Sequence, residues 1–126
     1  MSPIQTNLDQ FRNLSRSPNE GPVTMLNLLK FKEGGAESYR RYVSESGKFV
    51  SGVGGELIFL GKPVELLNGS EQWDAVMLVR YPSRRAFLKM TNDPEYLKIH
   101  NLREEALERA VLYALDQQSD FRGLFG

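Results

Sequence analysis

Apolar residues form two similar runs along the chain, Met25–Phe31 and Ala75–Tyr81, and each run ends in a cation followed by an aromatic residue. Both runs are apolar almost throughout, which is typical of strands that are covered on both faces. We therefore predict strands over 23–31 and 73–81. Because each run precedes a polar stretch and then a segment with helical spacing, the repetition indicates a duplicated strand–helix–strand unit.

The rest of the chain supplies helices and two further strands. Apolar residues spaced by three and four positions predict a helix that ends at Gly54, and a second helix that Asp93 and Pro94 divide in two. A mixed run around Gly61 and Pro63 predicts a strand with a bulge or an edge position. The predicted elements are a short helix before residue 17, a helix over 36–53, a strand over 56–67, a helix pair over 83–107 and a strand over 110–115.

This order of elements predicts a ferredoxin-like α+β fold (βαββαβ), a four-stranded antiparallel sheet with helices on one face and an extra N-terminal helix. We expect its two central strands to be parallel neighbours. The domain would span 22–116, between an N-terminal helical extension over 1–21 and a C-terminal tail over 117–126. Leu26 and Leu28 on one face of the first strand, and Met25 and Leu29 on the other, indicate that neither face is exposed to water, which favours a homodimer that packs sheet against sheet.

Composition excludes several classes of function. The 126 residues suffice for one domain, and sixteen acidic and sixteen basic residues cancel without long runs of one sign, so nucleic-acid binding is not expected. The chain has no cysteine, which excludes disulfides, thiolate nucleophiles and thiolate metal ligands. No apolar stretch approaches the ~20 residues that span a bilayer, and the N-terminus lacks a secretory pattern. We expect a cytoplasmic protein with no membrane partner.

Several segments together resemble one known family. Asn27–Phe31, Trp73–Val76, Arg80–Arg84 and Arg103–Glu108 are similar to the uncharacterised family numbered thirteen-thirty among the domains of unknown function, which belongs to the dimeric α+β barrel superfamily. The resemblance covers about residues 22–116. It implies the barrel fold and the homodimer, and it carries over no catalytic residue.

The wider superfamily that this resemblance implies contains cofactor-free quinone-forming monooxygenases, haem-degrading monooxygenases, muconolactone isomerases and stress-responsive proteins. Many of them hold a flat organic molecule in the cleft between the sheet and the helices. The resemblance therefore implies a small organic ligand for this chain.

The strands offer four candidate ligand-binding residues. Strand alternation predicts Asn27 and Trp73 on one face, with Lys30 and Arg80 on the other and side by side near one end of the sheet. Asn27, within an apolar strand, either holds a neighbouring loop or faces a polar cavity. Trp73 is either a core or dimer-interface residue or a stacking platform. Lys30 and Arg80 either bind an anion or remain solvated cations.

The second helix offers two more candidates. Its apolar face includes Arg103 and has His100 at its margin. A buried arginine needs a carboxylate, such as Glu65 or Asp74, or an anionic ligand. His100 is the only histidine; it is either a general base or an ordinary helix histidine, and alone it cannot build a metal site.

One arrangement points to haem. Haem-degrading members of the superfamily use an asparagine on the first strand, a tryptophan on the third and a histidine on the second helix, and Asn27, Trp73 and His100 follow the same order. The spacing between Trp73 and His100 is considerably longer than in those enzymes. We therefore expect no cofactor.

Three hypotheses for the function follow. The first is a cofactor-independent oxygenase or isomerase for a small aromatic or carbonyl compound, with His100 as base, Asn27 as oxyanion donor and Arg103 holding an acidic group. The second is a homodimer that binds a metabolite without catalysis or is purely structural. The third is an interaction module that uses the N-terminal helix and the tail with Phe121 and Phe125. A protein carboxylate beside Arg103 would favour the second hypothesis over the first.

Overall fold

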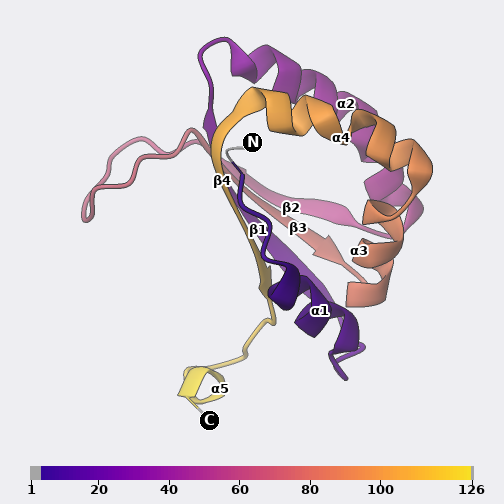
Figure 1. Cartoon of the computed structure of the whole chain (residues 1–126). Coiled ribbons are helices and arrows are strands. Elements are labelled where there is room, and N and C mark those ends of the chain that lie inside the picture. The colour runs from indigo at the N-terminus through magenta and orange to yellow at the C-terminus, as the bar shows by residue number, and fades with distance from the viewer. Residues whose placement is uncertain (1–3, 126) are drawn as a thin grey trace.

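The computed structural model describes residues 4–125 of the chain. It shows the predicted order of elements, including the extra N-terminal helix (Figure 1). β1 has its predicted bounds, whereas β3 begins at Ala75 and β4 begins at Leu107, each a few residues from the expected start. In chain order the elements are α1 (Leu8–Arg16), β1 (Val23–Phe31), α2 (Gly35–Gly52), β2 (Glu56–Gly61), β3 (Ala75–Tyr81), α3 (Arg84–Thr91), α4 (Pro94–Ala106), β4 (Leu107–Leu115) and α5 (Arg122–Phe125).

The strands form one ferredoxin-like sheet in the order β2-β3-β1-β4, and all neighbours are antiparallel. Leu26 of β1 lies opposite Leu78 of β3 on one side and Tyr113 of β4 on the other. The expectation of parallel central strands is therefore wrong. The crossover through α2 makes β2 parallel to β1, and the loop after β2 reverses the chain again, so β3 returns antiparallel to β1.

β2 is an edge strand with irregular pairing, as its glycine and proline predict. Its register against β3 shifts between Leu57 and Phe59, and the strand ends at Gly61, before Pro63. A long loop over residues 62–74 then leads to β3. Because β2 has no neighbour on its outer side, its apolar side chains remain largely exposed.

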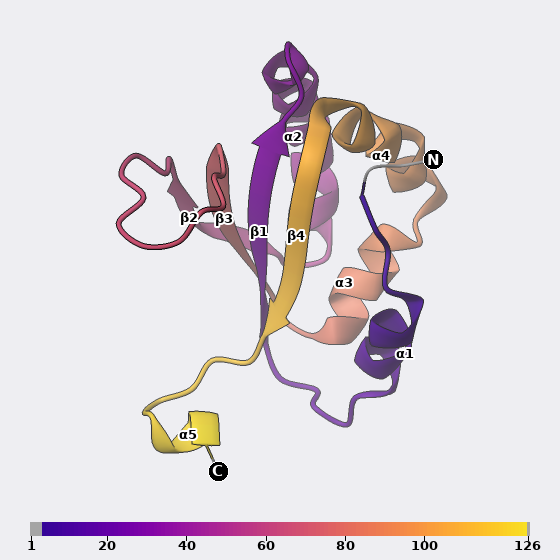
Figure 2. The ribbon, with the colours of Figure 1, turned by 60° about the vertical axis from the view of Figure 1, so that its left-hand side comes forward.

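The helices cover one face of the sheet and leave the other face open (Figures 1 and 2). α2 and α4 lie side by side over the covered face, while α1 and α3 lie nearer the end of the sheet where β4 finishes. Burial alternates along β1 accordingly. Val23, Met25 and Leu29 are buried under the helices, whereas Thr24 and Leu26 on the open face are only partly covered.

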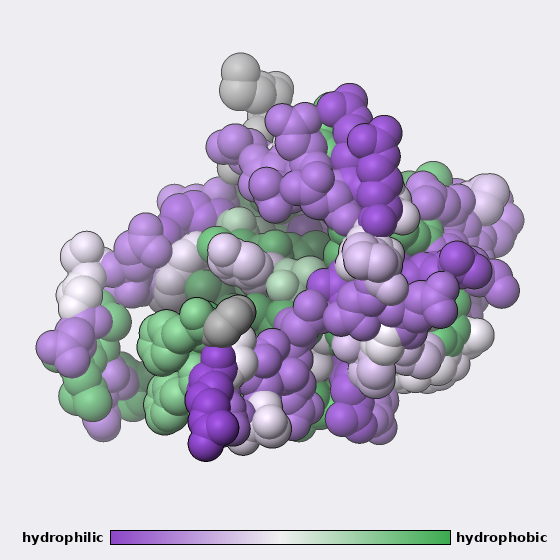
Figure 3. All heavy atoms as spheres, turned by 90° about the horizontal axis from the view of Figure 1, so that it is seen from below, coloured by the Kyte–Doolittle hydropathy of each residue, from purple (hydrophilic) through white to green (hydrophobic). Residues whose placement is uncertain are grey.

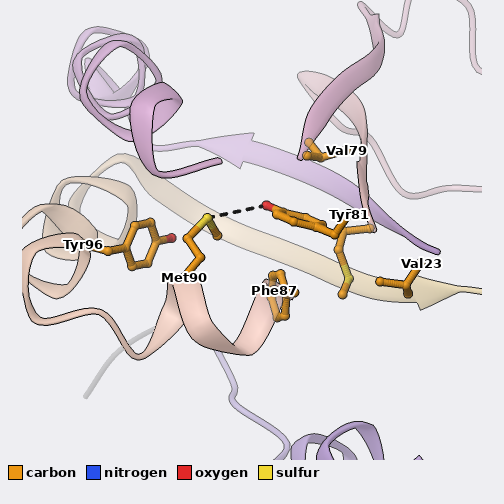
Figure 4. Close-up of a cluster of buried hydrophobic side chains, with 7 residues drawn as sticks. Val23, Val79, Tyr81, Phe87, Met90 and Tyr96 are labelled. Atoms are coloured by element: carbon orange, nitrogen blue, oxygen red, sulfur yellow. Dashed lines mark hydrogen bonds between the residues drawn. The ribbon is translucent and has the colours of Figure 1, made fainter. Parts of the chain in front are cut away.

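The core between the sheet and the helices consists of two clusters. In the first, drawn in Figure 4, the Tyr81 hydroxyl donates a hydrogen bond to the Met90 sulfur at 3.9 Å. This cluster contains Val23, Met25, Val79, Tyr81, Phe87, Met90 and Tyr96. The second contains Leu29, Tyr39, Ala106 and Leu107. Among the described residues, the buried polar or charged side chains are those of Asn27, Ser46 and Arg103.

Local capping fixes where α3 and α4 begin. The Ser83 hydroxyl accepts a hydrogen bond from the Ala86 amide at 3.0 Å, and the Asp93 carboxylate accepts one from the Glu95 amide at 2.9 Å. Pro94 occupies the first turn of α4, where its missing N–H is not needed. From its cap at Asp93, α4 continues with Tyr96 and Arg103 on its buried face.

A close backbone approach holds α2 against the end of α4. The Lys32 amide donates a hydrogen bond to the Ala106 carbonyl at 2.9 Å, and Gly35 lies directly against the same carbonyl group. A side chain at Gly35 would overlap with that oxygen, so only glycine fits here. The contact ties α2, which carries buried Ser46, to α4, which carries buried Arg103.

Candidate functional site

α4 carries its two candidate residues toward the sheet, as its spacing predicts. Tyr96, Arg103 and Ala106 are buried along one face of the helix, and Arg103 is only 9% exposed. His100 lies at the margin of this face, with 38% of its side chain exposed. The helix therefore positions a cation inside the domain and an imidazole at its edge.

Arg103 is a buried cation without a carboxylate partner. No Asp or Glu lies within ion-pair distance of it in the part of the chain that the structure describes. Its Nη2 atom is buried and has no hydrogen-bond partner among the same residues. The two acids considered from the sequence lie elsewhere, because Asp74 pairs with Lys30 and Glu65 is exposed on the 62–74 loop.

Three tyrosines surround the guanidinium of Arg103. The hydroxyls of Tyr42 on α2 and Tyr96 on α4 form a hydrogen bond of 2.5 Å, and the Tyr39 hydroxyl donates to the Met77 sulfur at 3.7 Å. The rings follow one another, with centroids 5.5 Å apart for Tyr39 and Tyr42 and 6.4 Å apart for Tyr42 and Tyr96. Tyrosines at helical spacing are expected among the core residues of a helix, so the sequence did not mark these three as site residues. Tyr96 lies on the same face of α4 as Arg103, and this was the available signal for it.

These tyrosines stay protonated at neutral pH. Burial raises the pKa of Tyr39 to about 12, although the charge of Arg103 and a hydrogen bond from it act in the opposite direction. Burial is also the main cause of the raised pKa values of Tyr42 and Tyr96. The site thus offers neutral hydroxyl groups and one positive charge.

His100 is a neutral base at the edge of this cluster. Burial lowers its pKa, the positive charge of Arg103 lowers it further, and Glu104 partly offsets both effects. Its Nε2 lies 3.5 Å from the Glu104 carboxylate, whereas Nδ1 is buried and has no partner among the described residues. A proton on Nε2, next to the carboxylate, leaves the lone pair of Nδ1 in the interior.

Asn27 lies on the helix-covered face of β1 and is buried. Its amide nitrogen donates to the Met25 carbonyl at 3.4 Å. Across the ladder it lies opposite Met77, whose sulfur contacts the Tyr39 hydroxyl. Because Tyr39 in turn interacts with Arg103, a continuous set of contacts leads from the central strand to α4. The side chains of Asn27 and Arg103 therefore both lie in the interior between the sheet and the helices.

Trp73 does not join these residues. It precedes β3, so the alternation used to place it beside Asn27 does not extend to it. Its ring is stacked by the guanidinium of Arg109 at 4.5 Å, and Arg109 lies opposite Lys30, on the open side of the sheet. The predicted grouping of Trp73 with Asn27 and His100 is wrong for this reason, and the haem-like arrangement fails with it.

Lys30 and Arg80 lie at opposite ends of the sheet. In the antiparallel register Arg80 is opposite Thr24, at the start of β1, whereas Lys30 is near its end. The expectation that they lie side by side assumed a parallel alignment and is wrong. Each cation has its own acid: Lys30 is 3.3 Å from Asp74, and Arg80 is 2.6 Å from Glu56. They do not form a joint anion site.

Residues 4–125 contain neither a metal-binding group of side chains nor a membrane-spanning helix. No group of three or more histidine, cysteine or acidic side chains there is arranged to hold a metal ion. None of the helices in that range is long and apolar enough to span a bilayer. The candidate site is the polar cluster around Arg103, because it holds a buried cation whose Nη2 has no partner among the described residues.

Comparison with known sequences assigns the chain to a family. Residues 28–115 match the family described as "Domain of unknown function (DUF1330)". The chain belongs to this family. The matched DUF1330 region contains His100 and Arg103 and begins directly after Asn27. No curated protein matches the sequence.

Solved structures similar to this DUF1330 protein share its fold. A protein of unknown function from Rhodopseudomonas palustris is 30% identical, with a TM-score of 0.85 over 92% of this chain and 97% of that one. A hydroxynitrile lyase from Passiflora edulis is 13% identical, with a TM-score of 0.65 over 82% and 99%. A dimeric protein of unknown function and ferredoxin-like fold from Bacteroides fragilis is 12% identical, with a TM-score of 0.55 over 78% and 98%.

Proposed function

We propose that this DUF1330 protein is a homodimeric barrel that binds a small organic anion between the sheet and α4 and acts on it without a cofactor. The ligand class is an aromatic or carbonyl compound that carries a carboxylate or forms an enolate. Buried Arg103, with its unpartnered Nη2, is the observation that supports this proposal. The proposal includes a cytoplasmic location.

The chemistry around Arg103 favours an anionic ligand. A buried charge without a partner is costly, and a ligand oxygen would satisfy Nη2 and neutralise the guanidinium together. The protonated tyrosines can donate further hydrogen bonds to the same ligand and add no negative charge that would repel it. Their rings offer stacking surfaces for a planar molecule.

His100 supplies a base for the reaction. Its lowered pKa keeps it neutral at pH 7, and the buried Nδ1 can remove a proton from a carbon beside a carbonyl group. The Asn27 amide and Arg103 would stabilise the resulting enolate oxygen. Return of the proton to another carbon completes an isomerisation, and a cofactor-independent oxygenase would begin with the same deprotonation.

Exposed apolar side chains on the open face of the sheet support the homodimer. Leu26 and Leu28 of β1 are only partly covered there, and Phe59 of β2 and Tyr113 of β4 are more than half exposed on the same face. Apolar surface of this extent is typical of an interface. The Bacteroides fragilis neighbour, described as dimeric, has the same fold and adds support.

Binding measurements test the proposal. A panel of small aromatic and keto acids is titrated by calorimetry, each beside its uncharged amide. We expect an acid to bind at least tenfold more tightly than its amide, and Arg103→Met to remove that preference. Arg40→Met, which changes an exposed arginine on α2, is the matched control and should leave binding unchanged. Equal affinity for acids and amides would contradict the proposal.

Proton exchange tests the catalytic part. The acid that binds is incubated with the protein in deuterated water and followed by NMR. We expect deuterium incorporation beside the carbonyl group, and a loss of at least a hundredfold in rate for His100→Asn with binding retained. Binding that requires Arg103 without any exchange would instead support the non-catalytic metabolite-binding protein.

A further inference from the structure

The C-terminal segment, residues 117–125, stands apart from the domain. Figures 1 and 2 show it leaving the end of β4 and ending in the short helix α5 away from the other elements. No residue of α5 is buried. Phe121, Leu124 and Phe125 are 77%, 62% and 84% exposed. Exposing two phenylalanine side chains and one leucine side chain to water is unfavourable, so this segment is suited to bind an apolar surface outside its own domain.

The segment nevertheless has a defined local conformation. The Asp120 carboxylate accepts hydrogen bonds from the amides of Arg122 and Gly123 at 3.0 and 3.3 Å. The Leu124 amide donates to the Phe121 carbonyl at 3.1 Å. These bonds present the three apolar side chains on one compact turn, which lowers the entropy that docking must overcome.

A second exposed apolar surface lies on the same side of the sheet. It comprises Phe59 of β2 and three residues of the following loop, Val64, Leu66 and Leu67, each at least half exposed. We call it the loop patch. Phe59 lies opposite Leu78 on the open face. In Figure 3 groups of apolar side chains are visible on the left-hand side of the molecule, the side away from the helices.

We propose that the C-terminal segment of one copy docks on the loop patch of a second copy of this chain, so that the two subunits exchange their tails. The inference rests on the homodimer of the proposed function. Both surfaces are apolar and both adjoin the open face, so docking would extend the sheet-to-sheet interface without a break. A two-fold axis makes the exchange reciprocal, and both tails are covered.

Chain length permits this exchange. β4 and β2 are the two edges of the sheet, about 14 Å apart at the spacing of neighbouring strands, and packed sheets lie about 10 Å apart. These two distances lie at right angles and make a diagonal of about 17 Å, and residues 116–121 span about 20 Å when extended, enough to reach Phe59 and the adjoining end of the loop. A tail that reached its own loop patch would have to cross its own open face, which the partner's sheet covers in the dimer.

Cysteine pairing tests the docking directly, because the chain has no native cysteine. Leu124→Cys and Val64→Cys are prepared as separate single variants, mixed under reducing conditions to allow subunit exchange, and oxidised. We expect a disulfide-linked heterodimer. The matched control replaces Val64→Cys with Ser44→Cys, on the exposed side of α2, and should give no product above background.

Other outcomes of this experiment overturn the proposal. A disulfide that forms only when both cysteines are in one chain would mean that the tail folds onto its own loop. No disulfide at all, with the dimer intact by sedimentation equilibrium, would mean that the tail docks elsewhere. A monomeric wild-type protein in the same measurement would reject the homodimer of the proposed function itself, which separates the two failures.

A second measurement does not depend on cysteines. Phe121→Ser combined with Phe125→Ser should raise the dissociation constant of the dimer at least about a hundredfold, because two rings leave a buried environment. Neither residue is needed for the fold of the described domain, where both are exposed. A dissociation constant within threefold of wild type would contradict the docking of the tail.

Discussion

Replacing Arg103 with methionine should not destabilise the ligand-free protein, although the side chain is buried. Methionine keeps much of the aliphatic stem and removes the charge. The unpartnered Nη2 donor costs about 1–3 kcal/mol in the folded state. The substitution also loses the interaction with the Tyr39 hydroxyl, worth about 1 kcal/mol. We therefore expect the free energy of unfolding to stay constant or rise by up to about 2 kcal/mol.

Urea unfolding followed by circular dichroism measures this change. Both proteins are compared at one protomer concentration, because dissociation of a dimer makes apparent stability concentration-dependent. In a thermal scan each kcal/mol corresponds to about 3–5 °C for a domain of this size. Arg40→Met is the control. Arg40 is 81% exposed and lies 3.8 Å from Glu37, so its loss should change stability by less than about 0.5 kcal/mol.

The opposite result would be informative. If Arg103→Met lowers the free energy of unfolding by more than about 2 kcal/mol relative to Arg40→Met, Arg103 stabilises the fold itself. The unpartnered Nη2 would then not mark a ligand site, and the proposed function would lose its main support. If Arg103→Met is stable but no longer prefers acids over amides, the wild-type protein keeps Arg103 for ligand binding at the cost of some stability.

Three further changes test other parts of the structure by urea unfolding. Tyr42→Phe should lower stability by about 1–2 kcal/mol, because it leaves the partner hydroxyl on α4 without its hydrogen bond; no change would mean that this bond contributes nothing. Because burial lowers the pKa of His100, the unfolded state takes up its proton first as pH falls. Stability should therefore decline below about pH 6.5 in wild type and less steeply in His100→Asn, whereas equal slopes would contradict the assignment. Gly35→Ala should cost at least about 3 kcal/mol through its overlap with the Ala106 carbonyl, while Gly47→Ala, in open space on the same helix, should stabilise by up to about 1 kcal/mol. Similar effects of the two alanines would mean that the close approach is absent.

Periodicity in the sequence was enough to place the elements and one half of the site. β1 was located residue by residue, because an unbroken apolar run between turn signals has few alternatives. The burial of Arg103 followed from its position on the apolar face of a helix. That it lacks a carboxylate did not follow, because the pairing of Asp74 with Lys30 depends on tertiary contacts between strands.

Strand direction and strand ends were the points that the sequence left undetermined. Side-chain alternation is the same in parallel and antiparallel pairs, so it gave no warning that Lys30 and Arg80 lie at opposite ends. Trp73 was misplaced because Asp74 ends the regular ladder. The Asp74 carboxylate accepts a hydrogen bond from the Phe31 amide at 2.9 Å, so the residues before β3 no longer alternate.

The strand order has a consequence for how the protein folds during synthesis. β1 is the first strand to be made, yet its two neighbours are β3 and β4, and Thr24 pairs with Leu115 from the far end of the chain. β1 therefore remains without one neighbour until nearly the whole domain has left the ribosome. Folds dominated by such distant pairings form slowly, in milliseconds to seconds, and this sheet can close only after residues 107–115 have been made.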